Sequence, residues 1–401
     1  MRNVVIAGYV RTPQSRARPK EPERDWLHGL RADELLAAII PELLRRTTLD
    51  SSELDDFLVG CALGVTENWT FGGRTPIFQA NMDARVPARF LDQQCGSGMA
   101  ALHMGFTEIA AGFADIVLAC GMEHMTRVPM GPKLFTEGTI QMNPELFSHE
   151  RYAGWDMDTT MVMGKTAEKL SKQTGFSREE MDAWGVRSHT LAAQARDQGF
   201  YDGEIVPIEA PQPDGTVMTV DRDQAIRDGA SLESMAQLKP IFDPENGVIT
   251  AGNASPLNSG AAAMVLMAEE EAQKRSITPL AVVRSIGFAG VDPTLMGLGP
   301  IPAAHKALAR GGFDVQDMDF WEINEAFSVV VLNAIRELGL DPERVNVKGG
   351  GLALGHAMGA TGIRLVGTLA RILHDQDARL GCAASCIGGG QGVATIIERM
   401  S

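Results

Sequence analysis

The sequence has few cysteines and no long apolar stretch, and these shortages exclude several kinds of protein. Its 401 residues include five cysteines, an odd number without C-x-x-C spacing, which argues against a disulfide framework and against a zinc site. No apolar run approaches the roughly 20 residues that span a bilayer, and no signal-peptide segment precedes the first strand pattern. We therefore expect a cytoplasmic protein with no membrane span.

Positive charge is also scarce, because 36 lysines and arginines stand against 51 acidic residues and leave a net charge of −15. Such a surface repels nucleic acid and anionic lipid, so we expect no nucleic-acid partner, and a phosphate-bearing ligand needs a local basic patch. A phosphate-binding loop is disfavoured too. No Lys-Ser/Thr follows the glycine-rich turns, and no G-x-G-x-x-G opens the first helix after a strand.

The chain does contain a regular alternation of short apolar runs with segments of helical spacing. Buried strands are predicted at 4–8, 57–61 and 115–121, and helices at 32–46 and from a turn at Cys95 to residue 111. Strands that alternate with helices predict an α/β fold with a mostly parallel sheet covered on both faces. The charged segment between the first strand and Asp25 is interpreted as a surface loop.

The composition changes between residue 122 and about residue 247, which are rich in Met, Pro, Asp and aromatic residues. Helices with polar faces are predicted at 166–174 and 178–197, and the strand-helix alternation returns at 248–250 and 261–268. We interpret 122–247 as a domain inserted over the end of the sheet. Its first methionines, Met122, Met125 and Met130, line an apolar channel or fill the core, and we favour the core.

An internal repeat indicates two similar halves. Residues 49–60 align without gaps on residues 313–324, and each segment follows an amphipathic helix. Cys95 follows Gly60 by 35 residues, and His356 follows Asn324 by 32, in turns that each lead into a helix and a short apolar strand. Duplication is favoured over a chance alignment, and the two turns are then expected to face each other across a pseudo-dyad.

The rest of the chain is organised around the turn at Cys95, within residues 92–102. A polar approach ends in this cysteine, and Gly96 and Gly98 allow a sharp entry into a helix. The unpaired N–H groups and the dipole of a helix N-terminus favour a thiolate, which suits a nucleophile. The alternative is a buried structural cysteine, because free cysteine is among the most buried residue types.

Four further segments are too rich in glycine and polar residues for ordinary core: 250–255, 322–327, 349–362 and 386–392. Alone, His356 suits a structural histidine, Asn324 a helix cap and Cys386 a core thiol. Acyl transfer between thiols needs these side chains together. An imidazole takes the proton of the nucleophile, and N–H groups or a water held by an amide stabilise the oxyanion. A second thiol protonates the carbanion. Three other cysteines in apolar strand contexts are interpreted as core: Cys61, Cys120 and Cys382.

Five ordered motifs resemble those of the thiolases, the acetyl-CoA C-acyltransferases. They are Gln94-Cys95-Gly96-Ser97-Gly98, Gly252-Asn253-Ala254-Ser255, Asn324-Glu325-Ala326-Phe327, Gly355-His356 with Gly359-Ala360-Thr361-Gly362, and Cys386-Ile387-Gly388-Gly389-Gly390. The resemblance covers essentially the whole chain. It implies the thiolase fold, in which two duplicated βαβ-rich halves form a layered α/β/α/β/α sandwich with an inserted loop domain.

The resemblance also implies a domain division and an assembly. Residues 1–121 and 248–272 would form the N-terminal half, residues 122–247 the loop domain that binds CoA, and residues 273–401 the C-terminal half. The family usually forms homodimers or homotetramers.

The activity implied is reversible, CoA-dependent cleavage of a 3-ketoacyl-CoA to acetyl-CoA and a shortened acyl-CoA. Cys95 would accept the acyl group, His356 would activate it, and Cys386 would act as the acid and base at the acetyl carbon. One oxyanion hole would use His356 and a water held by Asn324. The other would use the backbone N–H groups of Cys95 and Gly388.

CoA and acyl-CoA would be substrates, with no permanently bound cofactor and no metal. Ser255 would lie near the pantetheine, Arg227 near the adenine, and Met163 among the CoA contacts. Val162 stands where acetoacetyl-CoA thiolases typically have histidine, which predicts an acyl group larger than acetyl. Ala357 stands where the family commonly has proline, which loosens the backbone after the base.

Three other functions stay open. The first is a biosynthetic acetoacetyl-CoA thiolase that runs the reaction as a condensation. The second is a decarboxylating condensing enzyme of the ketoacyl-synthase type, which shares the duplicated architecture but normally has no second catalytic cysteine. The third is a non-catalytic acyl-CoA-binding subunit, which the presence of both cysteines, the histidine and the asparagine disfavours.

Overall fold

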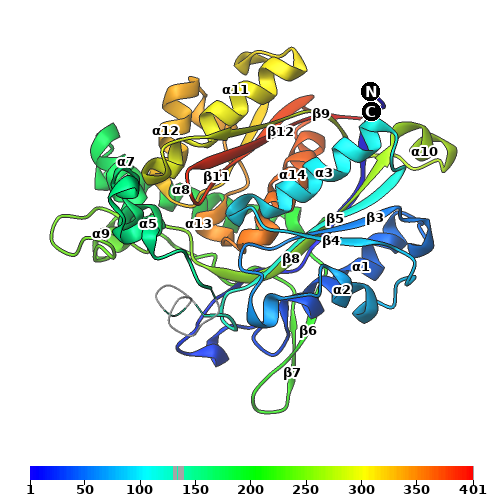
Figure 1. Ribbon diagram of the computed structural model, residues 1–401, viewed down its shortest axis with the longest axis horizontal. Coiled ribbons are helices and arrows are strands. Elements are labelled where there is room, and N and C mark those ends of the chain that lie inside the picture. Colours follow the sequence, from blue (N-terminus) through cyan, green and yellow to red (C-terminus); the bar gives the residue numbers. More distant parts are fainter. Residues whose placement is uncertain (130–132, 134–139, 401) are drawn as a thin grey trace.

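The strands form a ten-stranded mixed sheet whose two halves enclose a central pair of helices (Figure 1). The computed structural model describes residues 1–129, 133 and 140–400. The first half contains β1 (Val4–Arg11), β2 (Ser15–Arg16), α1 (Ala32–Arg46), β3 (Asp56–Gly60), α2 (Arg74–Gln79), β4 (Ala88–Leu91), α3 (Ser97–Ala111), β5 (Ile116–His124), β8 (Asn258–Ala268) and α10 (Glu269–Lys274). The second half contains β9 (Ala281–Gly290), α11 (Pro300–Gly311), β10 (Phe320–Ile323), α12 (Ser328–Leu338), α13 (Gly351–Leu354), α14 (Met358–Asp375), β11 (Leu380–Ile387) and β12 (Gln391–Arg399).

Strand β1 joins the two halves, because it pairs with both β8 and β9. Hydrogen-bonded neighbours follow the order β10-β11-β12-β9-β1-β8-β5-β3-β4, with β2 beside β8. Among the described strands of this sheet, β3 pairs in parallel with β4 and β5, and β10 with β11, while the other pairs are antiparallel. The prediction of a mostly parallel sheet is therefore wrong, because β8, β9, β1 and β12 return beside their neighbours in the opposite direction.

The two halves repeat the same local devices. Helices α1 and α11 each lead through a capped 3-10 turn into the strands β3 and β10. A carboxylate just before each strand then binds the start of the neighbouring strand: Asp55 accepts from the N–H of Ile116 at 3.0 Å, and Asp319 accepts from the N–H of Leu380 at 2.9 Å. This correspondence supports the duplication predicted from the aligned segments.

Helices α3 and α14 form the central layer, and alternate residues of each strand face either this layer or an outer one. One apolar core combines both central helices with strands of both half-sheets. A second core packs α1 against the outer face of the first half-sheet, and a third packs α11 and α12 against the outer face of the second. The α/β/α/β/α layering predicted from the resemblance is confirmed.

The two central helices touch backbone to backbone near their N-termini. A Cβ atom added to Gly98 would lie 2.4 Å from the carbonyl oxygen of Gly359, and one added to Gly362 would lie 2.2 Å from the nitrogen of Met99. No side chain fits in such a contact, so glycine is required at both positions. The turns that precede the two helices are thereby brought to the same end of the molecule.

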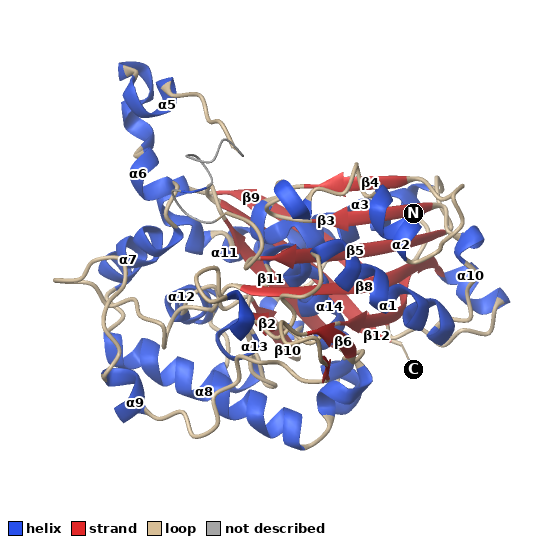
Figure 2. Cartoon of the chain, turned by 90° about the horizontal axis from the view of Figure 1, so that it is seen from below, coloured by secondary structure: helices blue, strands red, loops and turns tan. Residues whose placement is uncertain are grey.

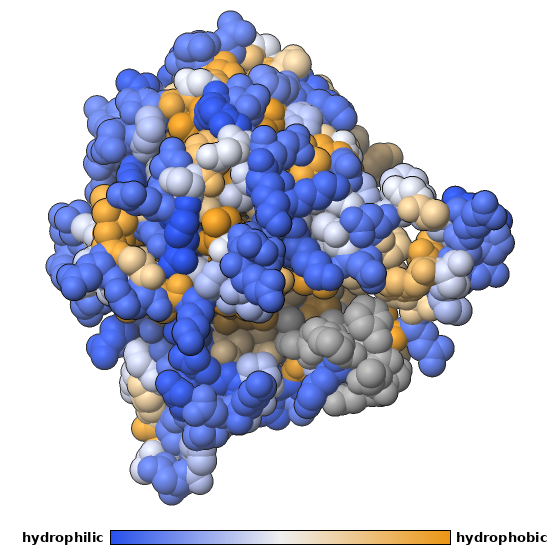
Figure 3. Space-filling view, turned by 90° about the vertical axis from the view of Figure 1, so that its left-hand side faces the viewer, coloured by the Kyte–Doolittle hydropathy of each residue, from blue (hydrophilic) through white to orange (hydrophobic). Residues whose placement is uncertain are grey.

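Between β5 and β8 the described part of the chain forms helices of 4 to 20 residues and a hairpin. Its elements are α5 (Glu145–Ser148), α6 (Met157–Thr160), α7 (Met163–Thr174), α8 (Arg178–Asp197), β6 (Ile208–Pro211), β7 (Val217–Val220) and α9 (Leu232–Ala236). In Figure 2, α5 and α6 project away from the sheet. Figure 3 views the side of the molecule on which this region lies, where apolar residues show between polar ones.

The proposed domain limits at 121, 247 and 272 stay a prediction.

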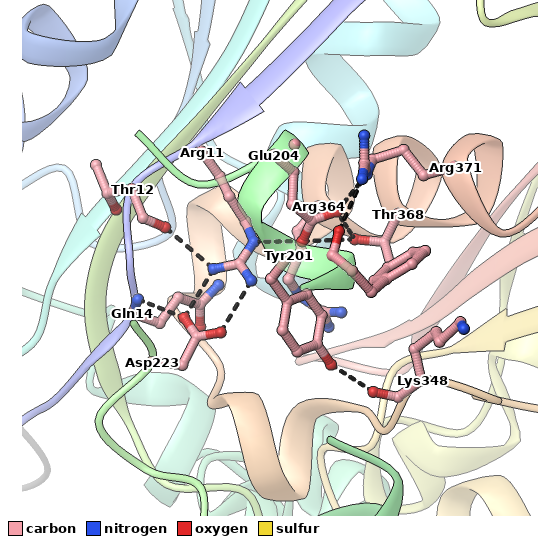
Figure 4. Close-up of polar contacts among 12 residues, drawn as sticks. Arg11, Thr12, Gln14, Tyr201, Glu204, Asp223, Lys348, Arg364, Thr368 and Arg371 are labelled. Carbon is pink, nitrogen blue, oxygen red and sulfur yellow. Dashed lines mark hydrogen bonds and ion pairs between the residues drawn. The ribbon is translucent and has the colours of Figure 1, made fainter. Parts of the chain in front are cut away.

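A buried ion-pair network anchors this region to the sheet (Figure 4). The guanidinium of Arg11, on β1, donates to Glu204 at 2.7 Å and to both carboxylate oxygens of Asp223 at 2.7 and 2.8 Å. Thr368, on α14, also donates to Glu204. Breaking such a fully buried pair on one side typically costs about 3 to 5 kcal/mol, so the network holds the inserted region firmly against β1 and α14.

Several sequence predictions hold closely, and some fail. The helices at 32–46 and 178–197 match α1 and α8, and the buried Met122 and Met125 are core, whereas Met130 lies outside the described residues. Residues 248–250 form no strand. The predicted surface loop before Asp25 holds for the exposed residues 19–24 but fails at its ends. Ser15 pairs with β8, and Asp25 is buried, where it accepts hydrogen bonds from hydroxyl groups of Ser15, Thr126 and Ser259. In the described part of the chain, no helix is long and apolar enough to cross a membrane.

Candidate active site

Cys95 lies in the 3-10 turn Gln94–Gly96 that leads directly into α3, as its sequence predicts. The turn is tight: Gln94 has a φ of 48°, and a Cβ atom on Gly96 would lie 2.4 Å from the side chain of Ile387. Strand β11 therefore packs directly against the turn. The side chain of Cys95 is only 8% exposed.

The thiol of Cys95 is not ionised by its helix, contrary to the sequence-based expectation. Burial raises the pKa of Cys95 to about 11, although a hydrogen bond from the backbone N–H of Gly388 opposes this rise. Desolvation disfavours the charged form, and here it outweighs the backbone hydrogen bonds that favour the thiolate. The thiol is therefore neutral near pH 7 and needs a base to become a nucleophile.

His356 is held in one tautomer by Thr361. Its Nδ1 lies 2.7 Å from the hydroxyl oxygen of Thr361, and that hydroxyl donates its own proton to the carbonyl of Ala357 at 2.9 Å. The hydroxyl oxygen must then accept from Nδ1–H, which leaves Nε2 without a proton. Burial, together with the charge of Arg364, lowers the pKa of His356 to about 3, so the ring is a neutral base.

Asn324 follows β10 and places its side-chain amide beside this base. Its Nδ2 lies 3.4 Å from Nε2 of His356, and its Oδ1 is buried without a hydrogen-bond partner among the described residues. The helix-cap interpretation is wrong, because the residue that precedes α12 is Phe327. A buried amide with an open oxygen is suited to holding a water molecule.

Cys386 and Gly388 come from the end of β11. Cys386 is fully buried, and burial, followed by the negative charge of a Cys95 thiolate, raises its pKa. The two sulfurs are thus close enough for ionisation of one to oppose ionisation of the other. With the N–H of Gly388 on Cys95, the structure brings both thiols to one place.

The glycine contact between the central helices brings the His356 turn to the same place. Cys95 stands three residues before Gly98, and His356 stands three residues before Gly359, which is the residue that Gly98 touches. The backbone N–H of His356 also binds the carbonyl of Pro256 at 3.1 Å. The two turns therefore face each other, as the repeat predicts.

Two of the three predicted CoA contacts lie beside these residues. The backbone N–H and the hydroxyl of Ser255 both donate to the carbonyl of Ala326, at 3.0 and 3.2 Å, two residues beyond Asn324. A Cβ atom on Gly388 would lie 3.4 Å from the sulfur of Met163, at the start of α7. Arg227 comes from another segment and contacts the same turn farther from Ser255, where its guanidinium donates to the carbonyl of Ala251 at 2.9 Å.

Sequence reasoning missed a cluster of arginines around Arg227. Burial and the charges of Arg18, Arg227 and Arg24 lower the pKa of Arg16 to about 10, and burial and Arg18 lower the pKa of Arg227. The Nε of Arg18 is buried without a hydrogen-bond partner among the described residues. The signal in the sequence was the basic run at 16–20 in an acidic chain, which the loop interpretation left without a role.

Comparisons with known proteins agree on one family. The model of the thiolase N-terminal domain matches residues 4–270, and that of the thiolase C-terminal domain matches residues 277–399. The chain is 41% identical to a 3-ketoacyl-CoA thiolase of Marinobacter nauticus, over 100% of this chain and 99% of that protein. It is 40% identical to a 3-ketoacyl-CoA thiolase of Chromohalobacter salexigens, over 100% of this chain and 98% of that protein.

Solved structures give the same result. The acetyl-CoA acetyltransferase of Bacillus anthracis matches with a TM-score of 0.87 at 35% identity, covering 100% of this chain and 99% of that one. Human mitochondrial 3-ketoacyl-CoA thiolase matches with a TM-score of 0.87 at 30% identity, with the same coverage.

The tautomer of His356 can be tested through Thr361. Thr361→Val removes the acceptor of Nδ1–H, and an unpaired buried donor costs about 1 to 3 kcal/mol, so alkylation of Cys95 by iodoacetamide near pH 7 should slow by about 10-fold or more. Thr361→Ser keeps the hydroxyl and should react like the unchanged protein. Peptide mapping by mass spectrometry locates the alkylated cysteine. Equal rates for the valine and serine variants would show that Thr361 does not set the tautomer.

Proposed function

Because this chain belongs to the thiolase family and is an acyltransferase, we propose that it cleaves a 3-ketoacyl-CoA with CoA, giving acetyl-CoA and a shortened acyl-CoA. The observation that carries the proposal is the convergence of two neutral thiols and one neutral imidazole. The N–H of Gly388 binds Cys95, and a negative charge on Cys95 raises the pKa of Cys386. The glycine contact between α3 and α14 brings His356 to the same end of the helices. CoA and acyl-CoA are the substrates.

In the first step, Cys95 attacks the 3-keto carbonyl while Nε2 of His356 takes its proton. The hydrogen bond from Nδ1–H to Thr361 keeps the ring oriented as it becomes positive. The carbon–carbon bond of the tetrahedral intermediate then breaks, and its electron pair passes to the leaving acetyl-CoA enolate. Cys386 protonates that carbon, which releases acetyl-CoA and leaves an acyl group on Cys95.

In the second step, the Cys386 thiolate takes the proton of an incoming CoA thiol, whose sulfur attacks the acyl group. Cys95 departs as the leaving thiolate and recovers its proton from His356. The raised pKa of Cys386 suits this role, because a weakly acidic thiol forms a strong base once it has given up its proton.

Two groups of donors are available for the oxyanions. The N–H of Gly388 already reaches Cys95, so together with the N–H of Cys95 it can bind the oxygen of the acyl thioester. The protonated Nε2 of His356 and a water on Asn324 would serve the second oxygen, which the unpartnered Oδ1 of Asn324 supports. We place the first pair at the Cys95 ester and the second at the enolate.

The arginine cluster gives CoA a binding site for its phosphates. Gln224 ties the segment of Arg227 to β2, since it accepts from the N–H of Arg16 at 2.9 Å and its own N–H donates to Gln14. Arg16 pairs across the sheet with Asn258, close to the Ser255 turn. Half-buried like charges are unfavourable without a counter-charge, so an anionic ligand such as a phosphate would relieve their repulsion.

Val162 and Met163 support an acyl group larger than acetyl. Val162 is the half-buried residue before α7, and Met163 lies next to Gly388. An apolar pair here favours an alkyl chain over a polar contact to a small substrate. Assembly as a homodimer or homotetramer, a cytoplasmic location and the absence of a permanently bound cofactor stay predictions.

The acyl-enzyme is directly detectable. Incubation with a 3-ketoacyl-CoA in the absence of free CoA should leave a hydroxylamine-sensitive acyl adduct on Cys95, seen by intact-protein mass spectrometry and located by peptide mapping. Cys95→Ala should show no adduct, while Cys382→Ala, a buried thiol on the same strand as Cys386, should acylate normally. A protein that forms no adduct with any acyl-CoA would instead be a non-catalytic binding subunit.

The preferred chain length follows from Val162. With CoA present, cleavage of longer 3-ketoacyl-CoAs should have a higher kcat/KM than cleavage of acetoacetyl-CoA. Val162→His should shift the preference toward acetoacetyl-CoA, since it places a polar group where short-chain relatives have one. A clear preference of the unchanged protein for acetoacetyl-CoA would reject the larger acyl group and favour the biosynthetic alternative.

The arginine cluster predicts that the affinity for CoA depends on its phosphate groups. Arg16→Gln combined with Arg18→Gln should raise the KM for CoA about 10-fold or more without changing kcat, because charge-assisted hydrogen bonds contribute about 1.5 to 3 kcal/mol. Pantetheine, which has no phosphate, should be used equally by both proteins. Arg45→Gln is the matched control, since Arg45 is an exposed arginine of α1 that is paired with Glu42. An equal loss with pantetheine would show that the cluster does not bind phosphate.

A further inference from the structure

His356 lies in a short connection between two helices, and each helix is held near its N-terminus by a buried carboxylate from another element. Before the turn, the N–H of Leu352 in α13 donates to Glu325 at 3.0 Å. After the turn, the N–H of Gly359 in α14 donates to Glu123 at 3.0 Å. Both carboxylates are fully buried, and the mechanism above uses neither.

Glu123, on β5, accepts hydrogen bonds from two other segments as well. Its donors besides Gly359 are the thiol of Cys61 at 3.2 Å, the N–H groups of Ala62 and Leu63 at 2.8 and 3.2 Å, and the amide of Asn68 at 2.8 Å. The carboxylate therefore joins the segment after β3 to the start of α14. Burial raises the pKa of Glu123 to about 7, while the hydrogen bonds favour its charged form.

Glu325 is the residue after Asn324 and has an equally complete set of donors. Besides Leu352, these are the indole of Trp184 at 2.9 Å, the hydroxyl of Ser188 at 2.6 Å and the amide of Asn346 at 2.9 Å. Asn346 in turn binds the N–H and the carbonyl of Ile323, at 2.8 and 2.9 Å. A Cβ atom on Gly350 would lie 2.4 Å from the carboxyl carbon of Glu325, so the backbone before α13 approaches it closely.

A buried carboxylate is unfavourable unless its oxygens are satisfied, and here neutral donors satisfy both groups. Loss of one oxygen would leave several donors unpaired at once, so each carboxylate fixes its donors relative to one another. The donors belong to the elements that carry the catalytic residues. Glu325 fixes Asn324 relative to α13, and Glu123 fixes α14 relative to β5 and the segment after β3.

We propose that Glu123 and Glu325 are positioning residues, which together clamp the Gly355–Ala357 turn so that Nε2 of His356 faces Asn324 and the thiol it deprotonates. The proposal rests on the proposed function for the role of His356. The clamp acts on orientation and not on substrate affinity. A displacement of about 1 Å at a catalytic group can lower the rate about 10²-fold, so the effect of losing either carboxylate is on kcat.

The test compares Glu123→Gln and Glu325→Gln with the unchanged protein. In each variant an NH₂ group replaces an acceptor and opposes the N–H donors, so kcat for 3-ketoacyl-CoA cleavage should fall about 10²-fold with little change in KM. In Glu325→Gln, alkylation of Cys95 by iodoacetamide near pH 7 should slow in parallel, and its pH profile should shift toward that of Cys95 without a base. In Glu123→Gln the loss of a negative charge that raises the pKa of Cys95 works against this slowing, so kcat is the deciding readout for that variant.

The matched control is Asp33→Asn. Asp33 is also a buried carboxylate, which accepts from Thr75 at 3.0 Å and from the N–H of Glu34 and the Nε–H of Arg31 at 3.1 Å, but it lies in the outer helix α1. It should lower the thermal midpoint without slowing alkylation of Cys95. Two milder variants, Asn68→Ala and Ser188→Ala, each remove one donor and keep the test valid where a glutamine variant does not fold. They should slow alkylation in the same direction.

The outcomes separate the clamp from the function. Turnover by the unchanged protein tests the proposed function alone. Alkylation of Cys95 tests the clamp even if the protein cleaves no 3-ketoacyl-CoA. Glutamine variants that lose thermal stability like Asp33→Asn, yet keep the kcat and the alkylation rate of that control, would overturn the clamp. A rise in KM at constant kcat would overturn it too.

Discussion

The close approach of α3 and α14 is the constraint on which the site depends. Gly98 faces the carbonyl of Gly359 and Gly362 faces the backbone of Met99, at distances that exclude any side chain. Two helices from sequence-distant halves can then begin at nearly the same point. Since each is preceded by a turn with one reactive side chain, the turns that carry the thiol and the imidazole lie at the same end of the molecule without a loop having to reach across it. The contact explains why glycine stands at residue 98 in α3 and at residue 362 in α14.

Burial then sets the charge states of Cys95 and His356. An exposed cysteine at a helix N-terminus is often a thiolate, but here desolvation raises the pKa of Cys95 and lowers that of His356, so both start neutral. A resting site without charge can receive an apolar acyl chain without stripping water from an ion pair. In the proposed mechanism charge appears only as the proton moves, and the N–H of Gly388 and the hydroxyl of Thr361 already contact the sulfur and the ring.

Much of this could be predicted from the sequence because the signals are local. The apolar period of residues 32–46 defines α1, and the glycines around Cys95 and His356 define the two turns. The direction of the Cys95 pKa shift could not be predicted, since it depends on how deeply β11 covers the turn. The hydrogen bonds of Glu123, Glu325 and Asp25 were also out of reach, because their donors come from distant segments and no spacing in the sequence relates them.

The duplication also explains how one fold supplies unlike groups to one site. Strands β5 and β11 occupy corresponding places, since Ile116 and Leu380 begin them and bind the corresponding carboxylates of Asp55 and Asp319. Near the end of β5 stands Glu123, which binds α14 of the other half. Just past the end of β11 stands Gly388, whose N–H binds Cys95 of the other half.

The end of each of these strands thus contacts the start of the central helix that belongs to the other half. At the end of β5 a carboxylate binds the N–H of Gly359, three residues after His356, and past the end of β11 an N–H binds Cys95. The turns differ as well, since one carries a cysteine and the other a histidine. The divergence of both the turns and the strand ends is therefore what makes a single asymmetric site from a repeated scaffold, and the tight contact between α3 and α14 places both turns at one end of it.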